Sequence, residues 1–184
     1  QVTPVYCYTD YPSAELLVNG KSQGRITKNK DSRLDRYRRR WQNVKYEKGE
    51  IKVVVYDEQG NKAGEKTVKT AGKPAKLQLT ADRSTIAADG CDLAFITVSL
   101  TDKNGTLCPD ADHSLEFKVT GAATFNSVCN GDATSLEVFT EPTMKLFHGQ
   151  LVVVVQASTA PGKATLSVRD KSTGIRASLP ITVK

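Results

Sequence analysis

Apolar and polar residues alternate in short runs along most of the chain, and each run ends at turn-forming residues. In the first 70 residues such runs begin near Val5, Ala14 and Ile51. A period of two is typical of β-strands with one buried face, because successive side chains of a strand point to opposite sides. Asn19 and Gly20 separate two runs and fit a hairpin with a type I′ turn, which needs φ > 0 at both central residues. The pattern predicts antiparallel strands.

The alternation stops at residues 72–74 (Gly-Lys-Pro) and then begins again. The runs of the second part are residues 77–79, 94–100, 115–119, 151–155, 164–168 and 181–183. Short strands with regular turns are typical of an immunoglobulin-type β-sandwich. The single tryptophan is Trp41, so the Cys…Trp…Cys spacing of antibody domains is missing and the apolar inner faces must hold the sandwich together. We predict an all-β chain of two consecutive antiparallel β-sandwich (immunoglobulin-like) domains, residues 1–72 and 73–184.

Residues 31–41 fit two kinds of secondary structure. Leu34, Tyr37 and Trp41 have the spacing of one helix face, with arginines around them. As a strand, the segment puts Tyr37, Arg39 and Trp41 on one face. The stem of Arg39 then lies along apolar surface while its charged head stays in water. The strand is favoured because both neighbouring segments have the β pattern.

The charge of the chain is unevenly distributed. Residues 1–72 hold 15 Lys and Arg against 9 Asp and Glu, which accounts for the whole net charge of +6 and supports the domain boundary. Basic residues cluster at positions 28–40 beside Tyr37 and Trp41, a pattern also found in nucleic-acid binding. No nucleic-acid motif accompanies the cluster, so a solvated face that shields an edge strand is favoured. No nucleic-acid partner is expected.

The composition, with 39% apolar and 25% charged residues, is that of an ordinary globular protein. The longest apolar run, residues 151–155, is far shorter than the roughly 20 residues needed to cross a bilayer. No membrane insertion is expected.

Few residues are candidates for metal or redox chemistry. The four cysteines, which lack a Cys-x-x-Cys spacing, are Cys7, Cys91, Cys108 and Cys129. With only His113 and His148 as imidazoles, both expected to be exposed in loops, no metal site and no cofactor are predicted. One disulfide or none is expected, and the three pairings that four cysteines allow stay open. Asp89, Asp92 and Asp102 flank turns and are interpreted as turn residues rather than calcium ligands.

No group of residues indicates catalysis. Glycoside hydrolysis needs two carboxylates about 5–9.5 Å apart across a cleft. Glu137 and Glu141 form the close glutamate pair of the second domain, and we interpret them as solvated loop residues. The Gly-x-Ser-x-Gly motif and glycine-rich phosphate loops are missing from the sequence. We predict no catalytic residues.

Two sets of residues are candidates for binding. Tyr8, Tyr37 and Trp41 could bind carbohydrate, because a flat aromatic ring suits the C–H face of a pyranose. The alternative that Trp41 and some tyrosines fill the core of a small domain is favoured. The second set lies in residues 130–150, since a long segment with weak alternation is either functional or ordered by a neighbour. The residues that we expect to contact another domain are Asp132, Phe139, Met144 and Phe147.

Two sets of motifs resemble parts of one enzyme family. The first set resembles a β-module found behind the catalytic barrel of bacterial glycoside hydrolase family 2 enzymes, notably β-galactosidases. Its members are residues 5–10 (VYCYTD), 14–24 (AELLVNGKSQG), Trp41 and 46–51 (YEKGEI). The second set is similar to the invasin-like immunoglobulin domain that often ends those chains and that also occurs in adhesins. Its members are residues 79–82 (LTAD), 88–90 (ADG) and 102–105 (DKNG).

The resemblance implies a function for the chain. It implies a non-catalytic C-terminal accessory region of a secreted β-galactosidase, which packs on or positions the catalytic domain of the same polypeptide. The family's catalytic glutamates lie in the barrel and have no counterpart here. We read residues 1–8 as the start of a cut from a longer polypeptide that is exported to the periplasm or cell surface. The alternative is an adhesin-like module that binds a polysaccharide or a cell-surface partner.

Overall fold

The computed structural model describes residues 2–184, which form two compact units, the first ending at Thr70 (unit 1) and the second spanning Ala71–Lys184 (unit 2). The described chain is all-β as predicted; it contains no helix, and therefore none that is long and apolar enough to cross a membrane. The division lies two residues before the predicted boundary at residue 72. Gly72 belongs to unit 2 because its N–H donates a hydrogen bond of 2.9 Å to the carboxylate of Asp102.

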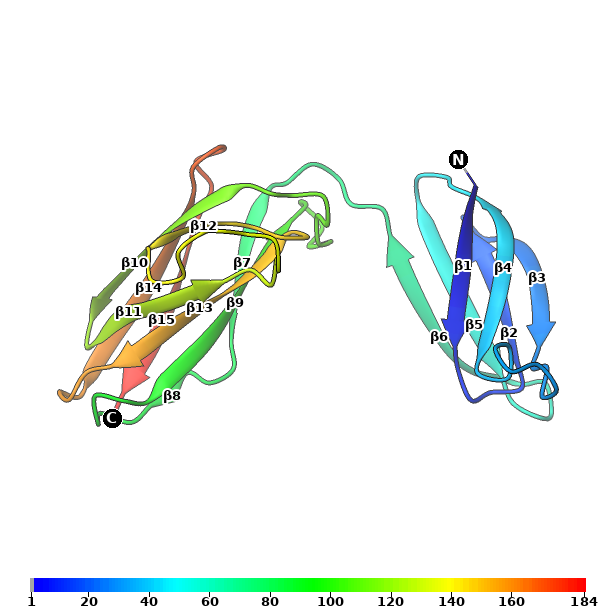
Figure 1. The fold of residues 1–184 in the computed structure, drawn as a ribbon, viewed down its shortest axis with the longest axis horizontal. Helices are drawn as coiled ribbons and strands as arrows, with labels where there is room; N and C mark the ends of the chain where they lie inside the picture. Colours follow the sequence, from blue (N-terminus) through cyan, green and yellow to red (C-terminus); the bar gives the residue numbers. More distant parts are fainter. Residues whose placement is uncertain (1) are drawn as a thin grey trace. The chain divides into compact units, whose positions relative to one another are not determined.

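Unit 1 consists of a two-stranded and a four-stranded antiparallel sheet (Figure 1). Its strands are β1 (Val2–Tyr8), β2 (Ser13–Val18), β3 (Lys21–Thr27), β4 (Arg38–Lys45), β5 (Glu50–Tyr56) and β6 (Lys62–Lys69). β1 pairs with β4, and the other sheet has the order β3-β2-β5-β6. Its buried core contains Ala14, Leu16 and Val18, which alternation predicted to face inward, together with Trp41 and Val44.

The turn between β2 and β3 has the predicted conformation. Asn19 and Gly20 have φ values of 48° and 78°, so both are left-handed as a type I′ turn requires. The Asn19 side chain also accepts a hydrogen bond of 2.8 Å from the N–H of Glu50, which begins β5. The hairpin turn is therefore tied to the neighbouring strand.

The segment at residues 31–41 is a strand only in its last four residues. β4 begins at Arg38, and residues 33–36 form a turn. Side-chain oxygens hold this turn: Asn29 accepts from the N–H of Asp31, and Ser32 accepts from the N–H of Asp35. Such local bonds compete with a sheet ladder. The strand prediction is therefore wrong for residues 31–37, which include Tyr37, and correct for Arg38 onwards.

Unit 2 is a sandwich of a four-stranded and a five-stranded sheet. Its strands are β7 (Lys76–Ala81), β8 (Thr85–Ile86), β9 (Leu93–Thr101), β10 (Ser114–Gly121), β11 (Ala123–Cys129), β12 (Thr143–Lys145), β13 (Gln150–Ala157), β14 (Gly162–Asp170) and β15 (Arg176–Val183). The sheet orders are β11-β13-β9-β7 and β12-β10-β14-β15-β8. All six alternating runs predicted for this half lie in strands.

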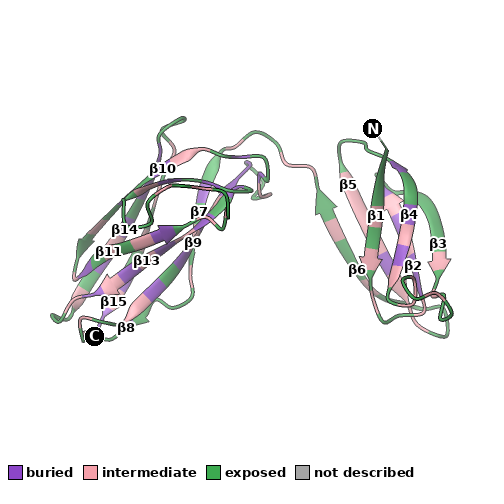
Figure 2. Ribbon diagram, viewed as in Figure 1, coloured by how far each residue is buried: buried purple, intermediate pink, exposed green. Residues whose placement is uncertain are grey.

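The core of unit 2 lies between its two sheets. Buried and less buried positions alternate along β9, β13 and β14, as expected for strands with one inward face (Figure 2). The fully buried side chains include Ile96, Val153 and Leu166. The inner faces thus form one continuous apolar cluster of this unit's own residues, separate from the core of unit 1.

Candidate functional site

Trp41 does not offer a stacking surface for a sugar. Its side chain is 5% exposed and lies in the core of unit 1 with Leu16 and Val18. The indole N–H donates a hydrogen bond of 2.9 Å to the backbone oxygen of Gly24, which joins β4 to β3. The favoured alternative from the sequence, that Trp41 fills the core, is correct, and Trp41 is removed from the carbohydrate-binding candidates.

Arg39 is on the predicted face of β4, but its charged head is not in water. The residue is 1% exposed, and its guanidinium donates a hydrogen bond to the backbone oxygen of Tyr11. Its Nε and Nη1 have no hydrogen-bond partner among the described residues. Burial lowers the pKa of Arg39. The expectation of a solvated head is wrong because Arg39 lies on the inward side of β4, as Trp41 does, and its head is held at the backbone of Tyr11, between β1 and β2.

Cys7 does not neutralise that buried charge. Burial raises the pKa of the Cys7 thiol, and the opposing effect of Arg39, which lowers it, is smaller. The thiol is therefore neutral near pH 7. Unit 1 thus contains a buried cation without a carboxylate against it. All four cysteines are free in the described structure.

Tyr8 and Tyr37 lie on the surface of unit 1, in a cluster of aromatic and charged side chains. Tyr8 and Tyr6 share the outward side of β1, opposite Arg38 and Arg40 of β4. The turn before β4 adds Asp35, which contacts Arg38 and Arg40, and the two residues between Asp35 and Arg38 in the chain, Arg36 and Tyr37. We call this cluster the tyrosine–arginine face; it consists of Tyr6, Tyr8, Asp35, Arg36, Tyr37, Arg38 and Arg40.

Ionic contacts order the tyrosine–arginine face. Asp35 lies 2.7 Å from Nε of Arg40 and 3.5 Å from Nε of Arg38. The hydrogen bond from Arg40 holds the pKa of the Asp35 carboxyl below its usual value. The guanidinium of Arg38 lies over the ring of Tyr6, 5.1 Å from its centroid, within the range of a cation–π contact.

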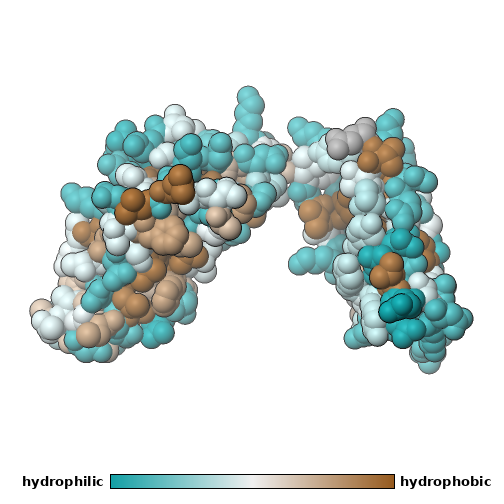
Figure 3. All heavy atoms as spheres, viewed as in Figure 1, coloured by the Kyte–Doolittle hydropathy of each residue, from teal (hydrophilic) through white to brown (hydrophobic). Residues whose placement is uncertain are grey.

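A second exposed surface lies in unit 2, in the segment between β11 and β12. Leu136 is 97% exposed, and Val138 and Phe139 are also exposed. We call residues 132–141 the apolar loop. Figure 3 shows apolar residues gathered on the viewer's face of unit 2, over β11 and β13. Phe95 on β9 is a further exposed apolar side chain of this unit.

The polar groups of the apolar loop are used to hold its own backbone. Asp132 accepts hydrogen bonds from the backbone N–H and the hydroxyl of Thr134, at 2.9 and 2.7 Å. Glu137 accepts from the backbone N–H of Lys145 at 3.1 Å, and the Phe139 carbonyl accepts from the N–H of Val128 at 2.8 Å. The loop is thus fixed to β11 and β12, with its apolar side chains directed outward.

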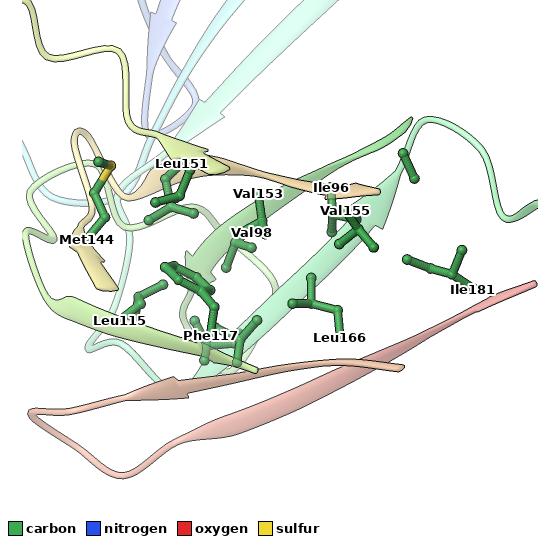
Figure 4. Packing of buried hydrophobic residues seen from close by; sticks show 14 of the residues in the cluster. Ile96, Val98, Leu115, Phe117, Met144, Leu151, Val153, Val155, Leu166 and Ile181 are labelled. Atoms are coloured by element: carbon green, nitrogen blue, oxygen red, sulfur yellow. The ribbon is translucent and has the colours of Figure 1, made fainter. Parts of the chain in front are cut away.

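The predicted contact residues of this region have different positions. Phe139 and Phe147 are exposed, and the ring of Phe147 lies 4.2 Å from that of His148. Asp132 is partly buried as a loop acceptor. Met144 is fully buried, because β12 pairs with β10 and directs the Met144 side chain into the core beside Leu115 (Figure 4). Met144 was therefore wrongly assigned to an interdomain contact.

Sequence reasoning missed Leu136 and Val138, the most exposed apolar residues of the loop. Their signal was present: Leu136 and Val138 alternate with Ser135 and Glu137 in a segment where polar residues predominate. Without the fold, this alternation could not be distinguished from that of a short strand with a buried side.

The pair of half-buried His113 and buried Asp170 was also missed. His113 Nδ1 lies 2.7 Å from Oδ2 of Asp170, whose side chain is fully buried in unit 2. Burial acts to raise the pKa of Asp170, but hydrogen bonds from Thr173, His113 and the backbone bring it below its usual value. His113 was expected to be exposed and is not; His148 is exposed as expected.

Several acidic residues of the described chain are engaged in local contacts. A groove on the outer side of β10, β14 and β15 has one acid in its lining, Glu116, which lies 3.9 Å from Arg169. Glu137 is an acceptor for the backbone of Lys145 rather than a solvated side chain. Asp89 and Asp102 likewise accept backbone N–H groups of their own turns. No group of three or more His, Cys, Asp or Glu within residues 2–184 could hold a metal ion.

The fold defines a pair of β-sandwich modules, and each module has exposed aromatic or apolar side chains. Residues 77–176 match the family described as glycoside hydrolase family 2 C-terminal domain 5, and residues 1–64 match a domain of unknown function. The chain therefore belongs to the glycoside hydrolase family 2 C-terminal domain family.

Three relatives illustrate the similarity. A β-galactosidase of Bacteroides ovatus is 44% identical over 177 residues, which cover 96% of this chain and 20% of the relative. A β-glucuronidase of Formosa agariphila is 31% identical over 121 residues, covering 65% of this chain and 12% of the relative. The crystal structure of a glycosyl hydrolase family 2 member from Bacteroides cellulosilyticus has a TM-score of 0.93 and 32% identity, covering 98% of this chain and 23% of that one. The chain thus spans a fifth or less of the curated relatives.

Proposed function

We propose that the chain is the non-catalytic C-terminal region of a glycoside hydrolase family 2 enzyme and packs on the catalytic domain of the same polypeptide. The observation that carries this proposal is the match of residues 77–176 to the C-terminal domain of that family. The parent enzyme is proposed to be a β-galactosidase. The high similarity to the Bacteroides ovatus β-galactosidase across nearly the whole chain supports this substrate class.

The arrangement of acids supports a non-catalytic role. Hydrolysis of a glycosidic bond requires an acid and a second carboxylate on opposite sides of the bond. In the groove of unit 2, Glu116 faces Arg169 instead of another carboxylate. Glu137 is used to hold the apolar loop to Lys145. Both carboxylates are thus engaged in contacts other than those the reaction needs.

The apolar loop is the surface that we propose to pack on the catalytic domain. A loop normally exposes polar groups and buries few apolar ones. Here Asp132 and Glu137 are used within the loop, while Leu136, Val138 and Phe139 face outward. Covering each of these side chains would contribute about 1.5–3 kcal/mol. An ordered backbone that presents apolar side chains fits docking against another protein surface.

We further propose that unit 2 is a β-sandwich of the immunoglobulin type. With the short strands β8 and β12 set aside, the seven remaining strands in chain order correspond to strands A to G. The sheet orders then become D-E-B-A and C-F-G, which are those of a constant-type domain.

We also propose export of the polypeptide to the periplasm or cell surface. The resemblance of the second half to adhesin-type domains supports this proposal, and cell fractionation tests it.

Activity measurements test the non-catalytic role. The purified 184-residue chain should hydrolyse no aryl β-galactoside, whereas the longer enzyme that contains it should. Turnover by the chain alone that is lost on substitution of one of its own carboxylates, with Glu116→Gln as the first variant, would overturn the proposal. Glu141→Gln, at an exposed carboxylate, is the matched control.

A further inference from the structure

The tyrosine–arginine face of unit 1 has the chemistry of a ligand site that the packing role does not use. We propose that this face binds acidic oligosaccharides, chains of pyranose rings that carry carboxylate groups. The proposal keeps Tyr8 and Tyr37 from the carbohydrate candidates of the sequence and replaces the buried Trp41 with arginines. It is independent of the proposed docking of unit 2.

The aromatic members of the face are accessible to a sugar. Tyr8 is 71% exposed, and Tyr37 and Tyr6 are also exposed. Tyr6 and Tyr8 are two residues apart on β1, about 7 Å along the strand, and point to the same side. Their rings provide a platform along the strand, and an aromatic ring offers a flat apolar surface with a polar hydroxyl at its edge. This combination suits the C–H face and the hydroxyl groups of a pyranose.

The cations of the face are held in place before any ligand binds. Arg38 lies over the ring of Tyr6, and Arg36 lies 5.9 Å from the centroid of the Tyr37 ring. The Nε of Arg36 donates to the backbone oxygen of Ser32 at 3.2 Å. Less side-chain entropy is lost on binding when the guanidinium is already oriented.

The charge of the face is not balanced internally. Three arginines stand against one carboxylate, Asp35, which leaves a net charge of +2. Asp35 pairs with Arg38 and Arg40, whereas Arg36 forms no ion pair among the described residues. A guanidinium binds a carboxylate through two parallel hydrogen bonds, so an anionic ligand complements this surface.

The face lacks the aliphatic side chains that fill the centre of a large protein–protein interface. Tyrosine and arginine are themselves common in such interfaces, so the titration below includes an acidic polypeptide as a competing ligand. The outward residues of β1 and β4 at this end of the ladder are Tyr6, Tyr8, Arg38 and Arg40, none of them aliphatic. The exposed aliphatic residue nearby in sequence is Leu34, in the turn. Rings for stacking and cations for carboxylates are both present, while an aliphatic centre is not.

Calorimetric titration of the 184-residue chain tests the proposal. Oligogalacturonides are added at low ionic strength, and neutral galacto-oligosaccharides of the same length serve as the ligand control. We expect saturable binding of the acidic sugar, weakened by added salt as ionic contacts are screened. Tyr8→Ala and Arg36→Gln should each weaken binding by about tenfold. Tyr8 is exposed and Arg36 is half-buried in a turn, with no ion pair to the residues that the structure describes, so both variants should fold.

The protein control is Tyr46→Ala. Tyr46 is also exposed, but it follows Lys45, which pairs with Val2 at the opposite end of the β1–β4 ladder from Tyr8. This variant should bind as the unaltered chain does. The proposal is overturned if the acidic sugar does not bind, if neutral sugars bind equally well, or if neither substitution weakens binding. Equal binding of polyglutamate would also overturn it and assign the face to an acidic polypeptide.

Discussion

The position of Arg39 illustrates what single residues add to the pattern. Alternation placed Arg39 on the same side of the strand as Trp41, and the structure agrees. It could not indicate depth, because the length of an arginine side chain normally allows its head to reach water. Arg39 is 1% exposed, and its guanidinium donates to the Tyr11 backbone oxygen instead of reaching water. The face of a residue follows from its own strand, whereas its depth depends on what packs against that face.

Replacing Arg39 by methionine should stabilise unit 1. The buried guanidinium has one hydrogen bond, to the Tyr11 backbone oxygen, and no carboxylate partner. Methionine keeps much of the volume and removes the cost of desolvating the charge, so we expect a gain of about 1–2 kcal/mol in the free energy of unfolding. Urea denaturation followed by the fluorescence of Trp41 measures it. Arg40→Met, at a partly exposed arginine paired with Asp35, should give no gain, and a loss of stability in Arg39→Met would contradict this account.

Asp170 should make the stability of unit 2 sensitive to acid. Its pKa lies below its usual value in the folded chain, so its contribution is present above the unfolded pKa of about 3.9 and is lost as pH falls through the lower folded value. Asp170→Asn should therefore cost about 2 kcal/mol at pH 7, with a gap to the unaltered chain that narrows below about pH 4. Thermal unfolding across this pH range measures the gap. Asp112→Asn, at an exposed carboxylate, is the control, and a gap that does not change with pH would refute the assignment.

At the scale of elements, the strands were largely predictable and the connections were not. Inward residues such as Ile96 and Val153 follow the period of two through β9 and β13. The turn before β4 was missed because the side chains of Asn29 and Ser32 bind its backbone, an effect that hydrophobic alternation does not report. β12 was missed because its three residues depend on pairing with β10, far away in sequence.

The turn into β13 should tolerate no side chain at Gly149. Its φ is 76°, and a Cβ there would overlap the backbone oxygen of Cys108. Gly131 has a similar φ of 80° but open space around it. A substitution at Gly131 therefore measures the cost of the backbone strain alone, without a steric collision. Gly131→Ala should cost about 1 kcal/mol, and Gly149→Ala about 2 kcal/mol more. Chemical denaturation measures both, and equal losses would show that the contact with Cys108 does not matter.

At the scale of the whole molecule, the sequence predicted two all-β units with separate cores and motifs resembling a known family, and these were found. It could not predict which apolar residues stay outside the cores. Phe139, Met144 and Leu136 occur in one segment, yet Met144 is buried and the other two are exposed. The distinction arises from the pairing of β12 with β10 and from the hydrogen bonds that fix the apolar loop outward.

Docking of the apolar loop on the catalytic domain is most directly tested by hydroxyl-radical footprinting. The oxidation rates of Leu136 and Phe139 are compared between the 184-residue chain and the longer enzyme, with the exposed Val68 of unit 1 as an internal reference. We predict at least about fivefold protection of Leu136 and Phe139 in the longer enzyme and no change at Val68, since covered side chains react only after opening. Equal oxidation of Leu136 and Phe139 in both proteins would contradict the proposed docking.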